Sequence, residues 1–309
     1  MAALDSAPAP SWPRAWIAYG ALLAVGAVLY VVCAFYPAHL PAWFPWEFSW
    51  PVYLATTLIL AWYFRGLQLT SRAERPSLLR SASFVIGVLS FYAVLQTHFD
   101  YLAQHMFFMH RFAHFILHHL GAMLIAGAMA GRTIRAGMPA FLKPVIDSRP
   151  VRGTLDVLQH PAVAPVLFIG LLYFWLIPEI HTRVMLDRNL YDLMNWTMGL
   201  NGIMFWSLIL DPRPKPPARL SFLMRFLQII AIELPQMVLG AILSLSSSDY
   251  YPVYRICGRI MDMTALNDQH YGGLIIWLPG TLMSFAAAIA VLLAIRRNEE
   301  ESELAQTNN

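Results

Sequence analysis

The sequence has little charge and almost no cysteine. Asp, Glu, Lys and Arg make up only 13% of its 309 residues, whereas soluble domains have about 25%. Its two cysteines, Cys33 and Cys257, form no CxxC or Cys/His pattern, so neither a disulfide framework nor a structural zinc site is predicted. The net charge of +3 resides in particular loops, which excludes a nucleic-acid-binding protein as an interpretation.

Hydrophobic residues are abundant instead, at 58% of the chain, and they occur in long runs. About 20 apolar residues are needed to cross the hydrocarbon core of a bilayer. We therefore predict an all-α, polytopic membrane helix bundle with about eight transmembrane helices. The predicted spans are Ala15–Tyr36, Val52–Leu69, Ser81–Thr97, His105–Met129, Ala162–Ile180, Leu190–Leu210, Ser221–Ser244 and Gly272–Ile295.

The first apolar run is too long for the core of a signal peptide and has no convincing cleavage site, so we expect a retained helix. The predicted organisation is a short cytoplasmic N-terminus (1–14), an N-terminal transmembrane helix (15–36), a transmembrane bundle (50–296) and a disordered cytoplasmic tail (297–309). We also expect a surface-lying segment at Ser148–Leu158 and an interfacial helix within Tyr254–Leu266.

The distribution of Lys and Arg predicts the orientation. Cytoplasmic loops carry an excess of these residues. With the N-terminus inside, most of them fall in cytoplasmic segments, and the outer loops hold only Arg183, Arg188, Arg255 and Arg259. Both termini are therefore predicted to be cytoplasmic.

Most of the histidines lie in one largely apolar stretch, Thr97–Gly127. A histidine in hydrocarbon is costly and is rarely left without a partner or a task. His110, His114 and His118 are spaced i, i+4 and i+8, so a helix places them in one stripe. The six histidines of the stretch are His98, His105, His110, His114, His118 and His119.

Imidazole and thioether groups come together at the head of this stripe, where His105, Met106 and Met109 lie. This ligand set suits copper better than magnesium or calcium. The orientation places the site at the outer face of the membrane. The candidate ligands for Cu(I) are His110, His114, His105, Met109, His98 and Asp100.

A structural interpretation stays open beside the metal site, because helix histidines can simply bond to neighbouring helices and methionine is ordinary core filler. Two interpretations also stay open for each of two charged residues within the predicted spans. Arg111 either extends towards the outer surface or pairs with Asp100, and Glu233, just before Pro235, either carries protons or satisfies a neighbouring helix. We interpret His160 as the start of a helix at the cytoplasmic interface.

Three motifs resemble the CtaG family of bacterial cytochrome c oxidase assembly factors, the multi-spanning caa-type group. The resemblance covers about Val52 to Ile295 and leaves Ala15–Tyr36 as an extra helix before a seven-helix core. The matching residues are His110-Arg-Phe-Ala-His114, then His160-Pro161 with Trp175 and Pro178, then Asp268-Gln269-His270-Tyr271-Gly272-Gly273 with Trp277, Pro279 and Gly280, and more weakly Leu234-Pro235-Gln236-Met237.

The chain also departs from the family pattern. Leu176 stands where the family usually has a histidine after the tryptophan, and Tyr191 and Asn195 stand where it has a second HxxxH. Ala122 and Met123 stand where the family has a pair of prolines after its HxxxH helix. The resemblance thus implies a divergent member whose metal site is rearranged.

The resemblance implies an assembly factor in the bacterial inner membrane that helps place copper in a terminal oxidase, with an oxidase subunit or other assembly factors as partners. Two alternatives stay open. One is a transporter of metal ions or protons along His118, His119, Glu233 and Asn195; the other is a redox protein that binds haem b. The supporting residues around the copper ligands are predicted to be Asp268, Gln269, His118 and Arg111.

Overall fold

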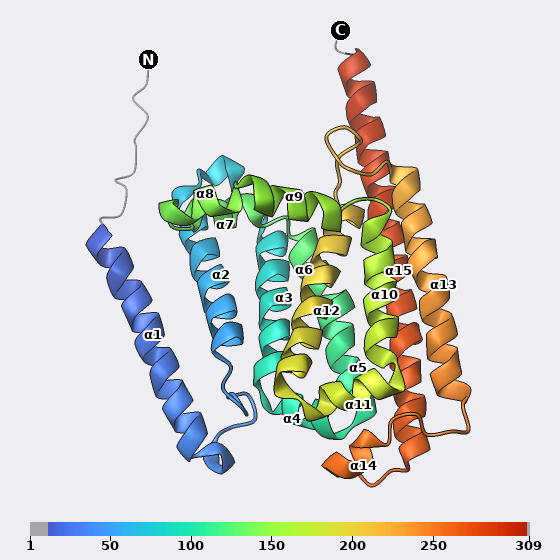
Figure 1. The fold of residues 1–309 in the computed structure, drawn as a ribbon. Helices are drawn as coiled ribbons and strands as arrows, with labels where there is room; N and C mark the ends of the chain where they lie inside the picture. The colour runs from blue at the N-terminus through green and yellow to red at the C-terminus, as the bar shows by residue number, and fades with distance from the viewer. Residues whose placement is uncertain (1–11, 308–309) are drawn as a thin grey trace.

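The computed structural model describes residues 12–307, and within them it shows helices and no strand. Long helices run between the two ends of a bundle, and short helices lie across each end (Figure 1). This architecture confirms the predicted all-α helix bundle. The long helices are α1 (Trp12–Phe35), α2 (Trp50–Leu69), α3 (Leu78–Gln96), α10 (Val163–Leu176), α12 (Arg188–Ile209), α13 (Phe222–Leu245) and α15 (Ala265–Thr307).

One further rod is built from three consecutive pieces: α5 (Phe107–Phe115), the π-helix η3 (Ile116–Leu120) and α6 (Gly121–Gly127). Four helices (α1, α3, α13 and α15) are long and apolar enough to cross a membrane alone. Two bent pairs of helices add to these four: the rod followed by α7 (Gly131–Gly137), and α9 (Arg149–Leu158) followed by α10. If each pair counts as one span, the number of candidate spans rises to six. The helices α2 and α12 are comparably long but less apolar, so the eight predicted crossings stay a prediction.

The outward faces of the long helices are apolar, as a bilayer requires. On α13, large aliphatic side chains are exposed at every third or fourth position, whereas a soluble bundle would bury such a stripe. Their exposed fractions range from 48% to 84%. They are Leu223, Leu227, Ile230, Leu234, Val238, Ile242 and Leu245.

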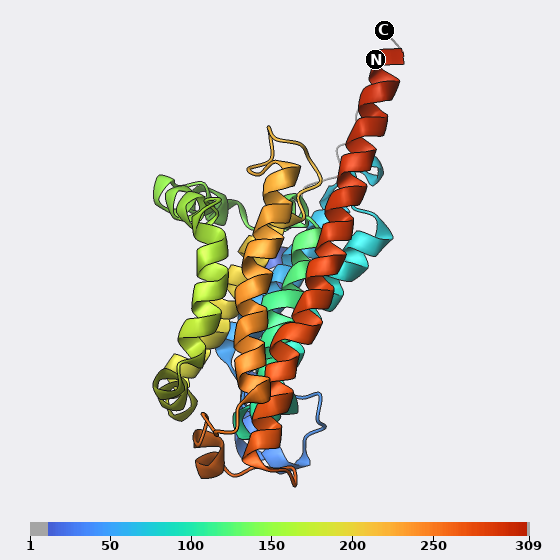
Figure 2. The same cartoon turned by 90° about the vertical axis from the view of Figure 1, so that its right-hand side faces the viewer.

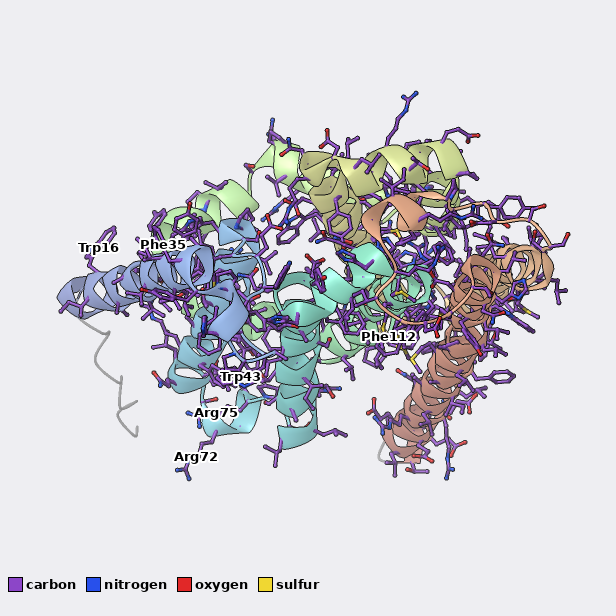
Figure 3. All side chains as sticks on the ribbon, turned by 90° about the horizontal axis from the view of Figure 1, so that it is seen from below. Trp16, Phe35, Trp43, Arg72, Arg75 and Phe112 are labelled. Atoms are coloured by element: carbon purple, nitrogen blue, oxygen red, sulfur yellow. The ribbon has the colours of Figure 1, made fainter. Side chains whose placement is uncertain are left out.

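The first helix, α1, stands at the edge of the bundle, as the view from below shows (Figure 3). Trp16 and Phe35 on α1 are 62% and 74% exposed. The helix contacts α2, where the Tyr53 hydroxyl donates to the Leu22 carbonyl at 2.8 Å. It is thus a peripheral addition to the bundle.

Short helices lie across both ends of the bundle (Figure 1). At the end where α15 finishes lie α7, α8 (Lys143–Ile146) and α9; at the other lie α4 (His98–His105), α11 (Pro178–Leu186) and α14 (Val253–Cys257). Helix α9 meets α10 at 74° and corresponds to the predicted surface-lying segment. By the positive-inside argument, we call the α7–α9 end the inner end and the α4–α11 end the outer end.

Two predictions about the termini of elements are wrong. The interfacial helix within Tyr254–Leu266 is only the five-residue α14, because Gly258 adopts a φ of +80° and ends it. The tail is not disordered from 297 to 307: α15 continues to Thr307, projecting beyond the bundle (Figure 2). Residues with high helix propensity and an Arg296–Glu300 pair at i, i+4 support this extension. Most of the predicted N-terminal segment 1–14, and residues 308–309, lie outside the described residues.

Candidate metal centre

Two histidines stand one turn apart on α5, in the interior of the bundle. His110 is 0% and His114 3% exposed, and their ring centroids are 4.5 Å apart. Because side chains at i and i+4 share one face of a helix, the HxxxH spacing alone produces this pair. Helix α5, which carries the pair, lies towards the outer end of the bundle (Figure 1).

The start of α5 is fixed by a carboxylate from another helix. Asp268 on α15 is fully buried and accepts hydrogen bonds from the backbone N–H groups of Phe107 at 3.1 Å and Phe108 at 2.9 Å. Its charge is balanced by Arg259, whose Nε lies 3.1 Å away. A carboxylate at a helix N-terminus satisfies otherwise unpaired N–H groups and interacts favourably with the helix dipole. Asp268 therefore positions the helix that carries the histidine pair.

The facing helix, α12, supplies the side chains that stand where the family has a second HxxxH. The Asn195 Oδ1 lies 3.1 Å from the Nε2 of His114. With the amide oxygen facing the ring, Nε2 carries the proton and Nδ1 keeps its lone pair. The Tyr191 ring centroid lies 5.7 Å from that of His110. The departures from the family pattern thus lie at the site itself.

Tyr191 links the site to Asp100 on α4. The tyrosine hydroxyl donates to Asp100 Oδ1 at 2.8 Å, and Gln104 Nε2 donates to Oδ2 at 2.8 Å. Burial raises the pKa of the Asp100 carboxyl from 3.8 to about 6, although the bond from Tyr191 opposes the rise. Both carboxylate oxygens are engaged, so Asp100 bonds to the residue beside the pair rather than standing free.

A third histidine, His181 on α11, joins the cluster, although it was not among the ligands predicted from sequence. Its ring centroid lies 5.3 Å from that of His110. Its Nδ1 donates to the Trp175 carbonyl at 3.0 Å, and its Nε2 accepts from the Tyr254 hydroxyl at 3.1 Å. Burial, and then the nearby positive charge of Arg111, lower the pKa of His181 to about 3, so the ring is neutral. The signal in the sequence was its position three residues after Pro178, the last residue of the motif that begins with His160-Pro161.

His110 differs from its neighbours because neither of its ring nitrogens has a hydrogen-bond partner among the described residues. The ring is fully buried. A buried polar group without a partner is uncommon and calls for an explanation such as a catalytic or ligand-binding role. His110 is therefore the candidate ligand best supported by geometry.

The next two histidines lie on the π-helix, and their surroundings are built around a close helix contact. The Trp206 indole donates to the His118 carbonyl at 2.9 Å, and His118 Nε2 lies 3.4 Å from Asn201 Oδ1. A Cβ on Gly202 would lie 2.8 Å from that same carbonyl, so only glycine permits this approach. His118 and His119 are thus held as part of the packing between the π-helix and α12.

A small cavity of about 20 Å³ lies beside these rings. It has room for roughly one water molecule, far less than the several hundred Å³ of pockets that hold larger cofactors. A haem group therefore does not fit among these rings. The polar residues that line it are Arg111, His114, His118, His119 and Gln236.

The predicted arrangements of Arg111 are both wrong. Its side chain is buried at 2% exposure, and none of its three guanidinium nitrogens has a partner among the described residues. Its Cζ lies over the ring of Phe107, 5.3 Å from the ring centroid. The side chain turns inward because the neighbouring helix α15 offers space at Gly272, where a Cβ would lie 3.2 Å from the Arg111 Cγ.

Glu233 does not line the cavity. Its carboxylate accepts hydrogen bonds from Thr281 and from Ser284, the latter at 2.6 Å. The proposed polar path through His118, His119, Glu233 and Asn195 is therefore not joined by this cavity. Glu233 instead connects α13 to α15.

The structure divides the predicted ligands into two groups. His98 and His105 lie in an aromatic cluster at the outer end: His98 is 5.1 Å from Trp46, and His105 is 4.2 Å from Tyr101, between ring centroids. His105 Nδ1 also donates to the Tyr101 carbonyl at 2.8 Å. Met109 is half-buried on α5. Of the six predicted ligands, His110 and His114 contact each other's rings, and His181 contacts the ring of His110.

The remaining motif residues have structural contacts. Gln269 accepts from the Tyr250 N–H at 2.8 Å and donates to the Ser248 carbonyl at 3.0 Å, which ties down the outer loop. His160 lies in the turn before α10, which begins at Val163, so its interpretation as a helix start is not met by its side chain. Its Nδ1 accepts from the Ala162 N–H at 3.3 Å, and its carbonyl accepts from the Val163 N–H at 2.9 Å. Leu176, in place of a family histidine, is buried in the apolar core.

The fold and the buried histidines together define a polytopic helical membrane protein with a histidine pair near one end of the bundle. Residues 61–298 match the family model described as cytochrome c oxidase caa3 assembly factor (Caa3_CtaG). The chain belongs to this family of assembly factors, as its motifs indicated, and α1 and the first half of α2 precede the matched region. No curated protein and no solved structure matches the chain.

Proposed function

We propose that this assembly factor carries Cu(I) for a terminal oxidase of the bacterial inner membrane, with His110 and His114 as its ligands. The observation that supports this most directly is the buried His110 ring, whose two nitrogens have no partner among the described residues. Imidazole nitrogens suit copper.

The second ligand is oriented for the same task. Metal-binding histidines usually donate their other ring N–H to a nearby oxygen, which fixes the tautomer and the ring position. The contact of 3.1 Å between His114 Nε2 and Asn195 Oδ1 has this form. It leaves His114 Nδ1, also without a partner among the described residues, available to a metal.

The site is sparse. Within residues 12–307 no group of three or more His, Cys, Asp or Glu side chains is placed to hold a metal ion. Both ring nitrogens of His181 already form hydrogen bonds, one with the Trp175 carbonyl and one with the Tyr254 hydroxyl. A pair of imidazoles suits a cargo ion that must be released again, whereas a closed four-ligand site would retain it.

The test is Cu(I) binding by the purified full-length protein in detergent. We expect His110→Ala/His114→Ala to abolish stoichiometric binding and Asn195→Leu to weaken it roughly 10- to 100-fold, since it removes the oriented hydrogen bond. His160→Ala is the matched control, because this histidine lies in the turn between α9 and α10, at the end of the bundle away from the pair. Stoichiometric Cu(I) binding that persists in the double variant would overturn the assignment, and an unchanged melting temperature would show that the variants fold.

A further inference from the structure

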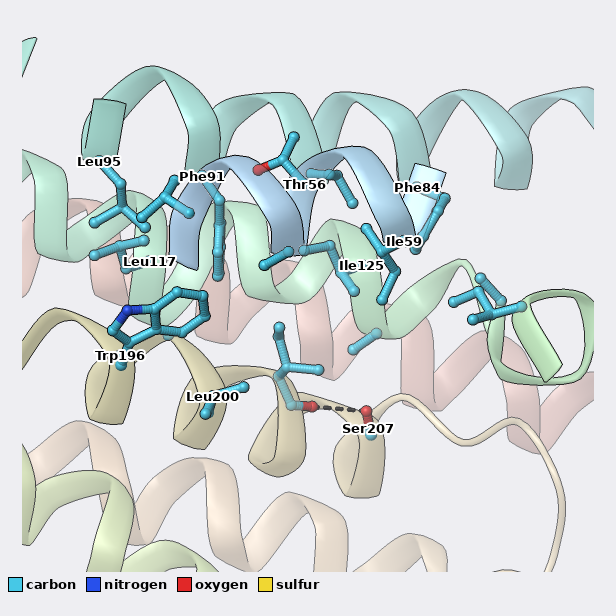
Figure 4. A pocket seen from close by; sticks show the side chains of 18 of the residues that line it. Thr56, Ile59, Phe84, Phe91, Leu95, Leu117, Ile125, Trp196, Leu200 and Ser207 are labelled. Carbon is cyan, nitrogen blue, oxygen red and sulfur yellow. Dashed lines mark hydrogen bonds between the residues drawn. The ribbon is translucent and has the colours of Figure 1, made fainter. Parts of the chain in front are cut away.

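An apolar cavity of about 460 Å³ opens between α2, α3, α6 and α12. Figure 4 shows its lining, with Phe91, Ile125, Trp196 and Leu200 turned towards the same space. The hydroxyl of Ser207, one of the few polar groups in the lining, already donates a hydrogen bond to the Ile203 carbonyl at 2.6 Å. The cavity therefore offers van der Waals contact and almost no hydrogen bonding.

A second cavity, of about 540 Å³, lies at the inner end of the first. The two share four lining residues, Ala126, Met129, Gly131 and Ser207, so they adjoin. The lining of the second cavity is strongly charged. It holds four arginines and two carboxylates, namely Arg75, Arg80, Arg132, Arg213, Glu74 and Asp211.

Positive charge exceeds negative charge in the lining of this inner cavity. Arg213 pairs with Asp211 at 2.7 Å. Among the described residues, no carboxylate lies within 4.0 Å of a guanidinium nitrogen of Arg75, Arg80 or Arg132. Three arginines thus line one space, and among the described residues none of them forms an ion pair, since Asp211 pairs with Arg213 and Glu74 accepts from the Ser71 hydroxyl.

We propose that the two cavities together bind one acidic phospholipid, with its phosphate headgroup among Arg75, Arg80 and Arg132 and an acyl chain along the apolar cavity. Basic pockets between transmembrane helices on the cytoplasmic side suit anionic headgroups. The apolar cavity adjoins the headgroup site and follows the direction of the spans, as an acyl chain does.

The charge pattern favours a lipid over a transmembrane helix of a partner protein. A helix in the apolar cavity would leave the three arginines uncompensated, whereas an anionic lipid satisfies both parts of the site. The cavity is also open to the bilayer, since Leu200 on its rim is 52% exposed. A lipid can therefore enter sideways from the membrane.

The experiment is a titration of the detergent-purified full chain with phosphatidylglycerol, read by native mass spectrometry, with phosphatidylcholine of the same acyl chains as the comparison. We expect tighter binding of phosphatidylglycerol. Each arginine near an anionic lipid contributes about a fivefold change in affinity, so Arg80→Gln/Arg132→Gln is expected to weaken phosphatidylglycerol binding roughly 10- to 30-fold.

Two further variants separate the site from general charge. Arg149→Gln/Arg297→Gln removes the same charge from the inner end outside the cavity, and we expect unchanged binding. Ala55→Phe fills the apolar cavity from an exposed position on α2 and is expected to abolish retention of both lipids. Equal affinity for the two lipids, or equal loss in both double arginine variants, would overturn the proposal.

Discussion

Two arginines are fully buried in the part of the chain that the structure describes, and they have opposite surroundings. Arg225 is 0% exposed and donates to the carbonyl groups of Asp211, Arg213 and Leu220, the last two at 2.7 and 2.8 Å. The guanidinium of Arg111 has no such acceptor among the described residues. An arginine stays protonated when buried, so an uncompensated guanidinium costs folding free energy.

This contrast gives a prediction at the residue scale. Arg111→Met, which keeps the apolar stem and removes the charge, is expected to leave the free energy of unfolding unchanged or to raise it by about 1–3 kcal/mol. Arg225→Met is expected to lower it by about 2–4 kcal/mol, because it strips charged donors from three carbonyls. Thermal and denaturant unfolding in detergent measure both. A larger loss at Arg111 than at Arg225 would show that Arg111 has a stabilising partner.

The removal of the Arg111 charge also bears on the proposed copper site. Arg111 follows His110 directly, and its positive charge repels a cation bound to that ring. Cu(I) affinity in Arg111→Met is therefore expected to rise. The same variant thus reports on folding and on metal binding at once.

At the scale of elements, the start of α5 requires a hydrogen-bond partner from elsewhere in the fold. Its first N–H groups are buried, so they need a partner that is not solvent. Asp268 supplies it from α15, more than 150 residues along the chain. The histidine pair is therefore positioned by a long-range cap and not by its own helix alone.

We predict that Asp268→Ala lowers the free energy of unfolding by about 3–5 kcal/mol, since it removes the cap from α5 and leaves the partly buried Arg259 without its partner. The matched control is Ser77→Ala. Ser77 caps α3 by accepting from the Arg80 N–H at an exposed helix end, where a cap contributes about 1 kcal/mol. Chemical denaturation in detergent compares the two. Equal effects would mean that the Asp268 contacts do not hold α5.

At the scale of the whole molecule, the two ends of the bundle differ in charge and in their short helices. The inner end carries the basic loops and α7–α9. The outer end carries α4 and α11, with α5 close to it (Figure 1). Copper delivery from outside the cytoplasm requires the outer end to face away from it. The proposed function therefore depends on which end of the bundle faces the cytoplasm.

Cysteine labelling tests this orientation. In a background with Cys33 and Cys257 replaced, we expect Ser248→Cys to react with a membrane-impermeant maleimide in intact spheroplasts. Thr154→Cys on α9 is expected to react only after permeabilisation. Both positions are exposed, so access to the reagent depends on the side of the membrane. The reverse pattern would place the histidine pair at the cytoplasmic face.

The sequence by itself determined the class of the protein and the pairing of His110 with His114. Both depend on short-range regularities: apolar runs long enough for a bilayer, and the i, i+4 spacing that places two side chains on one face of a helix. The family motifs, which the match over residues 61–298 confirms, were readable for the same reason.

Only the tertiary structure decided what surrounds that pair. His181, Asn195 and Asp268 approach it from three other helices, and Arg111 turns inward beside Gly272 instead of pairing with Asp100. His98 and His105, close to the pair in sequence, belong to a separate cluster with Trp46 and Tyr101. Local spacing fixes which residues share a helix face, but contacts between helices depend on how whole helices pack, which no local pattern specifies.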